Sequence, residues 1–187
     1  RETAEQWLSS AKLRVKESSY ANYVNIVYKH ILPILGEEMM MNLTTSKLND
    51  FINFKLTSGR LNGKGGLSAK SVRDIMTVYR SIENYAAREF GIKETHFTMP
   101  KIEKKQTDIL TPTERKKLEN YLMHNQNKTN IAILLCLFTG LRVGELCGLK
   151  WEDIDFDNAV LYVKRTVQRV SKNGKSQVII GTPKSKT

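Results

Sequence analysis

The spacing of apolar residues divides the chain into a helical first half and a second half that ends in strands. Before residue 91, apolar side chains recur every three or four positions, as they do along the buried face of an α-helix. Short polar or glycine-containing breaks separate four such stretches, which favours a small four-helix bundle. The predicted inward positions, helix by helix, are Ala4, Trp7, Leu8 and Ala11; Tyr20, Tyr23, Val24, Val27, Ile31 and Leu35; Leu48, Phe51, Ile52 and Leu56; and Val72, Ile75, Met76, Tyr79, Ile82 and Ala86.

Residues that cap helices indicate where these four helices begin and end. Pro33 should distort the last turn of the second helix, and Gly36 should end that helix. The fourth helix is the longest and is predicted to run from Ala69 to Phe90. The predicted caps, in chain order, are Thr3, Ser18 or Ser19, Thr44 or Thr45, and Ser68.

The second half begins with two more predicted helices. The sequence Thr111-Pro112-Thr113-Glu114 combines a threonine cap, proline at the first helical position and glutamate at the third, so a helix should start there and run to about His124. The next helix, Thr129 to Thr139, is almost entirely apolar and is expected to be buried. Gly140 should end it.

Beyond Asp157 and Asn158 the pattern changes to that of strands. One strand is predicted across Val160 to Val170, and a return strand across Gln177 to Ile180. Asn173-Gly174 lies between them and favours a tight hairpin turn. The predicted fold class is therefore mainly α with a small antiparallel β-sheet, an α+β arrangement.

The segment from Gly91 to Leu110 is charged, contains a proline and lacks any hydrophobic period. These properties are typical of a linker between domains. The predicted organisation is a helical domain at residues 1–91, a linker at 92–109 and a second domain at 110–187.

The formal charge of +11 and the pI near 9.6 predict a polyanionic partner, most simply nucleic acid, with an anionic membrane surface as the lesser alternative. Up to Lys101 there are 15 basic and 10 acidic residues, and after it 15 and 9, so each half carries excess positive charge. This balance suits two domains that clamp one polyanion. No apolar run of 18 residues predicts a membrane span, and the N-terminus lacks a signal-peptide pattern.

Two cysteines, Cys136 and Cys147, lie in apolar helical sequence and are predicted to be reduced core residues of a cytoplasmic protein. Neither a Cys-x-x-Cys pair nor a nearby histidine accompanies them. No metal site is therefore predicted.

Basic residues follow one face of the fourth helix, at Lys70, Arg73 and Arg80. The simplest interpretation is that these basic residues form an ordinary solvent-exposed helix face. However, the predicted flexible basic loop Arg60–Gly66, with three glycines within four residues, directly precedes this helix, and a helix N-terminus offers unpaired N–H groups to phosphate. The further predicted DNA contacts are Lys64, Ser68, Ser71 and, on the basic hairpin, Arg169.

Arg142 is the least expected residue of the second half. Its guanidinium lies between Leu141 and Val143, after an apolar helix, where a charge is costly unless an anion meets it. One interpretation is an internal ion pair with Glu145, three residues on. The other is that Arg142 binds an anion from outside the protein.

The surrounding sequence, Thr-Gly-Leu-Arg-Val-Gly-Glu-Leu-Cys-Gly-Leu-Lys-Trp-Glu-Asp-Ile-Asp-Phe, closely resembles the first catalytic box of the tyrosine recombinases, the phage-integrase family. The resemblance implies that Arg142 is the first arginine of the active site and that Glu145 supports it. The four-helix layout, with Leu-Ser-Ala-Lys-Ser-Val-Arg opening the last helix, is more loosely similar to the SAM-like core-binding domain of the same family.

The resemblance also implies the chemistry. Family members cleave and rejoin double-stranded DNA at specific sites through a 3′-phosphotyrosyl intermediate, without metal or other cofactor, as dimers to tetramers on DNA. Integration and excision of a mobile element in a bacterium or phage would be the role. The catalytic lysine lies on the family's hairpin, which suggests Lys184, with Lys186 as the alternative.

The sequence departs from the family pattern in one major respect. The later His-x-x-Arg box and the nucleophilic tyrosine are not found in these residues, since the seven tyrosines lie in predicted helices or a strand. The sequence is therefore expected to hold an incomplete catalytic domain that is inactive alone. The alternative hypothesis is a DNA-binding protein or regulatory module without catalytic activity.

Overall fold

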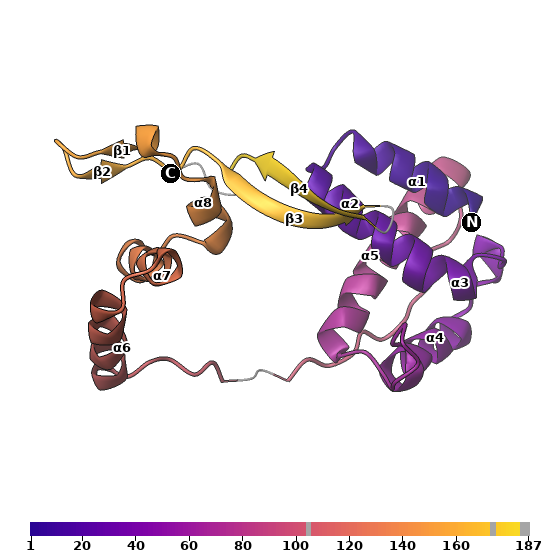
Figure 1. The fold of residues 1–187 in the computed structure, drawn as a ribbon. Coiled ribbons are helices and arrows are strands. Elements are labelled where there is room, and N and C mark those ends of the chain that lie inside the picture. Colours follow the sequence, from indigo (N-terminus) through magenta and orange to yellow (C-terminus); the bar gives the residue numbers. More distant parts are fainter. Residues whose placement is uncertain (104–105, 173–174, 184–187) are drawn as a thin grey trace. The chain divides into compact units, whose positions relative to one another are not determined.

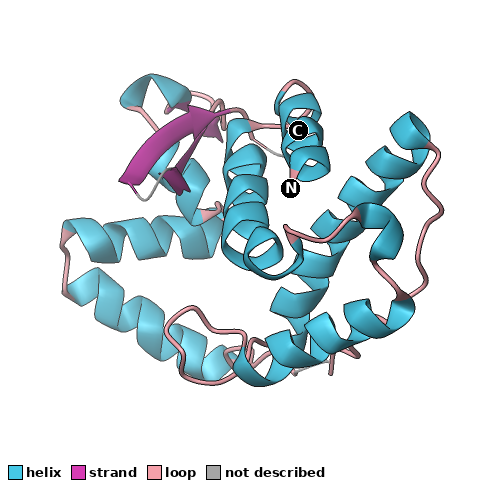
Figure 2. Ribbon diagram, turned by 90° about the vertical axis from the view of Figure 1, so that its right-hand side faces the viewer, coloured by secondary structure: helices cyan, strands magenta, loops and turns pink. Residues whose placement is uncertain are grey.

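The computed structural model describes residues 1–103, 106–172 and 175–183, except for the side chain of Lys172. The chain separates into two compact units, one made largely of residues before 104 and one largely of residues after 105. Helices dominate the chain, as Figure 2 shows. The strands of the described residues all follow residue 150. The predicted class, mainly α with a small antiparallel β-sheet, is confirmed, although the strands form two small sheets in place of one.

The first unit contains α1 (Glu2–Lys12), α2 (Glu17–Ile26), a π-helical turn (Val27–Ile31), α3 (Leu32–Leu35), a 3₁₀ turn (Met40–Asn42), α4 (Thr45–Ser58) and α5 (Ala69–Phe90), as Figure 1 shows. Thr44 and Ser68 cap α4 and α5, as predicted, by accepting hydrogen bonds from backbone N–H groups three residues on. The first two helices begin earlier than predicted, at Glu2 and Glu17, and their N-cap residues, Arg1 and Lys16, make no side-chain hydrogen bond.

Most of the predicted inward positions form the hydrophobic core of the first unit. Val27, Leu48, Val72 and Met76 are completely buried there. The positions that are only half-buried lie around this core and pack against it; they are Tyr20, Tyr23, Val24 and Leu56. Burial of this apolar surface is the main favourable term that holds the four long helices together.

Pro33 produces the expected distortion, although earlier in the helix than its own position. Proline removes one backbone donor and clashes with the carbonyl four residues before it, which is that of Lys29. The chain responds with the π-helical turn Val27–Ile31, and Pro33 then sits near the start of α3. The predicted single second helix is therefore three consecutive helical pieces.

Residues 95–100 fall within the predicted linker, but they pack against the first unit. The backbone N–H of Thr95 donates to Glu83 Oε1 (2.9 Å), and its hydroxyl donates to the Leu43 carbonyl (3.0 Å). The Phe97 ring meets the Tyr79 ring edge-on, with 5.8 Å between centroids. The extended segment that follows α5 is thus held to the bundle as far as Pro100, which is itself buried.

The second unit contains α6 (Pro112–His124), α7 (Lys128–Thr139), α8 (Val143–Gly148) and a 3₁₀ turn (Trp151–Asp153). Thr111 and Glu114 form the predicted capping box at the start of α6. Two strand pairs follow: β1 (Ile154–Asp155) with β2 (Val160–Leu161), and β3 (Thr166–Lys172) with β4 (Lys175–Gly181), seen as separate ribbons in Figure 1. The strand predicted across residues 160–170 is therefore two strands in two sheets.

The prediction that the apolar helix α7 is buried is wrong for the part of the chain that the structure describes. Ile131 and Phe138 are 53% and 56% exposed, and none of its residues is buried. Helices α6 and α8 contact α7 and cover only part of its surface. The prediction that Cys136 and Cys147 are core residues is also wrong, since Cys147 on α8 is exposed and Cys136 on α7 is only half-buried, although both thiols are free as predicted.

The helices of the described residues are too short or too polar to cross a membrane.

Candidate functional site

Arg142 stands at the junction between α7 and α8. Gly140 ends α7 with a φ of 72°, a left-handed conformation that glycine adopts without steric cost. Arg142 is then extended (φ −73°, ψ 148°) and is the residue that precedes the first turn of α8. The local sequence Thr-Gly-Leu-Arg therefore turns the chain sharply and places one arginine at a helix N-terminus.

Glu145 holds Arg142 through both of its carboxylate oxygens. Oε2 accepts a hydrogen bond from the backbone N–H of Arg142 (3.0 Å), and Oε1 accepts one from the guanidinium Nη1 (3.0 Å). The carboxylate is nearly buried, with 9% of its side chain exposed, whereas 69% of the Arg142 side chain is exposed. The ion pair that the sequence suggested exists, yet the guanidinium is not enclosed by it.

The protonation state of Glu145 follows from the same contacts. The hydrogen bond from the backbone N–H of Arg142 lowers the pKa of Glu145 most, and the guanidinium adds to this effect against the opposing effect of desolvation. Glu145 is therefore ionised at neutral pH. It fixes one nitrogen of the Arg142 guanidinium and leaves that group four further N–H donors for a ligand.

The hairpin candidates are only partly described. Arg169 lies on β3 and is exposed, as a DNA contact requires. Lys184 and Lys186 both lie outside the described residues, so their assignment stays a prediction.

The candidate phosphate contacts of the first unit lie around the N-terminus of α5. Lys64 and Lys70 are exposed, and so is Arg73, although its guanidinium is 3.4 Å from the Pro100 carbonyl. The hydroxyls of Ser68 and Ser71 form a hydrogen bond with each other (2.9 Å), and the Ser68 hydroxyl also accepts one from the backbone N–H of Ser71. Because the pair uses one of its own protons, it offers one hydroxyl donor to a phosphate where the sequence suggested two.

The loop before α5, Arg60–Gly66, is held by several hydrogen bonds, whereas its glycines had predicted a flexible loop. The backbone N–H of Arg60 donates to the Gly65 carbonyl (3.1 Å), and its side-chain Nε donates to the Gly66 carbonyl (2.9 Å). Lys64 N–H donates to the Asn62 side chain. The loop therefore presents the exposed Lys64 from a defined turn.

Arg80 differs from the other basic residues of α5, and the prediction that it faces a partner needs correction. Its Nη1 donates to Glu83 Oε2 (2.7 Å) and to the Thr95 carbonyl (2.9 Å). Its guanidinium lies 4.1 Å from the centre of the Phe97 ring. Because Glu83 is only 2% exposed and needs a cation beside it, the structure uses Arg80 as an internal counter-ion.

Sequence reasoning gave no role to Asp153, which is completely buried and contacts Lys164 and Arg165. It also gave no role to Gly144 and Gly148, which lie four residues apart on α8 and so share one face of that helix. That spacing of glycines in a short helix was the available signal, because glycine inside an element often marks a close backbone approach.

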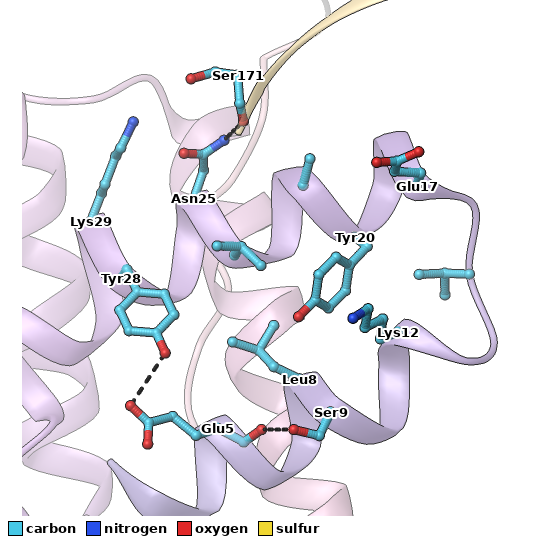
Figure 3. Close-up of a pocket in the computed structure, with 13 residues that line it drawn as sticks. Glu5, Leu8, Ser9, Lys12, Glu17, Tyr20, Asn25, Tyr28, Lys29 and Ser171 are labelled. Atoms are coloured by element: carbon cyan, nitrogen blue, oxygen red, sulfur yellow. Dashed lines mark hydrogen bonds between the residues drawn. The ribbon is translucent and has the colours of Figure 1, made fainter. Parts of the chain in front are cut away.

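A separate hollow of the first unit lies between α1 and α2 and is shown in Figure 3. Tyr28 donates a hydrogen bond to Glu5 across it (3.3 Å). Leu8, Tyr20 and Val24 line it as well. None of the candidate catalytic or DNA-contacting residues that the structure describes lines this hollow, so it is not the candidate site.

Two family patterns match the chain. Residues 1–56 match the phage integrase N-terminal SAM-like domain, and residues 108–184 match the phage integrase family. The second match includes the whole stretch around Arg142 and Glu145.

Curated relatives carry the same family names. The ICEBs1 integrase of Bacillus subtilis is 27% identical over 183 residues, which cover 96% of this chain and 47% of the relative. A XerC-like tyrosine recombinase of Caldanaerobacter subterraneus is 35% identical over 135 residues, covering 65% of this chain and 34% of the relative. The chain thus spans between about a third and a half of the length of these curated relatives.

Solved structures share the fold. The Tn1549 transposon integrase, in complex with transposon right end DNA, aligns with a TM-score of 0.69 at 22% identity over 97% of this chain and 57% of that protein. A lambda integrase tetramer bound to a Holliday junction aligns with a TM-score of 0.65 at 21% identity over 97% of this chain and 49% of that protein. These likenesses show the shared fold, and the two family matches and the named relatives show that the chain belongs to the phage integrase family of tyrosine recombinases.

Proposed function

We propose that the complete protein is a site-specific DNA recombinase that integrates and excises a mobile element. It cleaves and rejoins strands of double-stranded DNA through a 3′-phosphotyrosyl intermediate. It acts as a dimer to tetramer of identical chains assembled on the DNA, in the cytoplasm of a bacterium. Support comes from the integrase relatives and from structural neighbours that bind DNA, one of them as a tetramer.

The observation that carries this proposal is the arrangement of Arg142. A buried carboxylate, Glu145, holds one edge of the guanidinium, and 69% of the side chain remains exposed. During phosphodiester cleavage, negative charge grows on the non-bridging oxygens of the phosphate. A planar arginine fork held in place before the reaction stabilises this charge with two parallel hydrogen bonds.

Other groups complete the proposed reaction. A tyrosine hydroxyl attacks the phosphorus and forms the phosphotyrosyl bond, which conserves the bond energy for rejoining. Lys184, with Lys186 as the alternative, donates a proton to the departing 5′ oxygen as general acid. The nucleophilic tyrosine and the second arginine box are proposed as parts of the complete protein. The reaction needs no metal or other cofactor in this proposal.

Both units are proposed to contact the DNA backbone. In the first unit, the contacts come from Lys64 on its hydrogen-bonded turn and from Ser68, Lys70, Ser71 and Arg73 at the start of α5. In the second, they come from Arg169 on β3. Arg80 is left out of this surface because it pairs with Glu83.

Binding by many phosphate contacts predicts a steep dependence of affinity on salt, because each neutralised phosphate releases condensed counterions. Between low and moderate salt the affinity for duplex DNA should fall by about a thousandfold or more. A titration of fluorescent duplex across a salt series measures this. A flat salt response would contradict binding through the phosphate backbone.

Substitution of Lys70 by alanine, and separately of Arg73, should weaken duplex binding several-fold. Both side chains are exposed, so the change in the free energy of unfolding should stay within about 0.5 kcal/mol. Lys116→Ala on α6, an exposed lysine outside the proposed surface, is the matched control for lost charge. Equal losses of affinity in all three variants would mean that only net charge matters and that the proposed surface is wrong.

A further inference from the structure

Asp153 is a completely buried carboxylate with several donors around it. Its Oδ2 accepts hydrogen bonds from the backbone N–H of Lys150 (3.0 Å) and from Arg165 Nη1 (2.7 Å). Its Oδ1 lies 3.1 Å from Lys164 Nζ and accepts a longer bond from Arg165 Nη2 (3.4 Å). A buried carboxylate with this many donors is ionised and holds its partners in a fixed geometry.

Arg165 connects Asp153 to two neighbouring elements. Its Nη1 also donates to the carbonyl of Gly148, the last residue of α8 (3.2 Å). Its own backbone lies immediately before β3, which begins at Thr166. The buried ion pair therefore joins the end of α8, the 3₁₀ turn that follows α8, and the start of β3.

Two glycines bring α8 close to the same strand. A Cβ atom on Gly144 would lie 2.6 Å from Thr166 Oγ1 and 2.9 Å from the Val167 carbonyl oxygen. One on Gly148 would lie 2.9 Å from the carbonyl oxygen of Arg165. These distances are shorter than any ordinary contact of a side chain, so α8 lies against the backbone of β3 at a separation that only glycine permits.

The same short helix carries Arg142 at its N-terminus. Helix α8, about one and a half turns long, therefore connects Arg142 at its N-terminus to strand β3, against which it packs. In the sequence, Lys184 follows the last residue of β4, Gly181, by three positions. Because α8 lies against β3, a shift of β3 along or away from α8 moves the β3–β4 strand pair relative to Arg142.

We propose that Asp153 and Arg165, together with Gly144 and Gly148, position the β3–β4 hairpin relative to Arg142. They act as positioning residues, and this inference rests on the proposed recombinase function. Misplacement of a catalytic group by about 1 Å costs as much as about a hundredfold in rate. Loss of the Asp153 charge should therefore impair the step that the hairpin lysine performs more than DNA binding.

The test is single-turnover strand cleavage by the complete protein with Asp153→Asn. Asparagine keeps the size of the side chain but removes the charge that holds Arg165 and Lys164. Two suicide substrates are compared: an ordinary phosphodiester and one with sulfur in place of the bridging 5′ oxygen. A thiolate leaves without protonation, so the second substrate does not need the general acid. Asp157→Asn, the same substitution at an exposed acid between β1 and β2, is the matched control.

We expect Asp153→Asn to cleave the ordinary substrate about tenfold to a hundredfold more slowly, with DNA affinity within about twofold of wild type. On the sulfur substrate the loss should shrink to about threefold or less. Asp157→Asn should behave as wild type on both. If Asp153→Asn does not fold, Gly144→Ala is assayed on the same two substrates, because it displaces β3 without removing a charge.

Three outcomes are distinguishable. Recovery on the sulfur substrate supports the positioning role, since a general loss of structure would slow both substrates equally. Unchanged cleavage of the ordinary substrate, or an equal loss on both, overturns it. If the wild-type protein forms no covalent adduct on either substrate, the proposed recombinase function itself fails.

Discussion

Replacing Arg142 by lysine in the complete protein is expected to lower strand cleavage by roughly a hundredfold or more, with an unchanged melting temperature. Lysine keeps the positive charge and can still pair with Glu145, which holds Arg142 at 3.0 Å. It loses the planar two-pronged donor set that matches two phosphate oxygens in the transition state. Ground-state affinity for DNA should therefore survive while the rate of cleavage falls.

The matched control for this variant is Arg115→Lys on α6. Arg115 also pairs with a glutamate on its own helix, Glu119, at 2.7 Å, and is half exposed. It should change neither cleavage nor melting, because exposed ion pairs contribute little to stability. A lowered melting point with normal cleavage per folded molecule in Arg142→Lys would return Arg142 to the role of an internal counter-ion. Melting curves and suicide-substrate cleavage on the same preparations decide between these results.

The largest expected effect on stability belongs to Arg80. Alanine at this position would leave Glu83, 2% exposed, without its cation and remove the contact with the Phe97 ring. Breaking a buried pair by removing one partner costs about 3 kcal/mol or more, because the remaining charge stays desolvated. The segment Thr95–Pro100 should also loosen, since Arg80 donates to the Thr95 carbonyl.

Urea denaturation of the chain of 187 residues, followed by far-ultraviolet circular dichroism, measures this loss. Lys70→Ala on the same helix is the control, with an expected change within about 0.5 kcal/mol. A free energy of unfolding in Arg80→Ala that matches the control would show that Glu83 finds another partner. In that case Arg80 would again be a candidate for the DNA surface.

The sequence predicted best those elements whose ends carry their own signals. The limits of α5 and α6 agree with the structure because Ser68 and Thr111 cap them locally. The strands were predicted less well. Strand β1 has two residues, too few for an alternating pattern, and residues 162–165 interrupt the run that the pattern presents as one strand.

The candidate site shows the same division between local and distant contacts. Arg142 and Glu145 are three residues apart, so their pairing could be predicted from helical spacing. Asp153 and Arg165 are twelve residues apart across two strands, and nothing in the spacing indicates that they meet. Arg80 was misjudged because its partners include Thr95 and Phe97, beyond the end of its helix, in a segment that lacks any periodic pattern.

The central claim is that Arg142 neutralises the phosphate that is cleaved. Its most direct measurement compares wild type and Arg142→Ala, in the complete protein, on a suicide substrate whose scissile phosphate is replaced by the uncharged methylphosphonate. The methylphosphonate carries no negative charge for Arg142 to neutralise. The effects of the Arg142→Ala substitution and of the methylphosphonate on the cleavage rate should therefore not be additive. We predict that the loss caused by Arg142→Ala, about a hundredfold or more on the phosphate, falls at least about tenfold on the methylphosphonate. An equal loss on both substrates would contradict the claim.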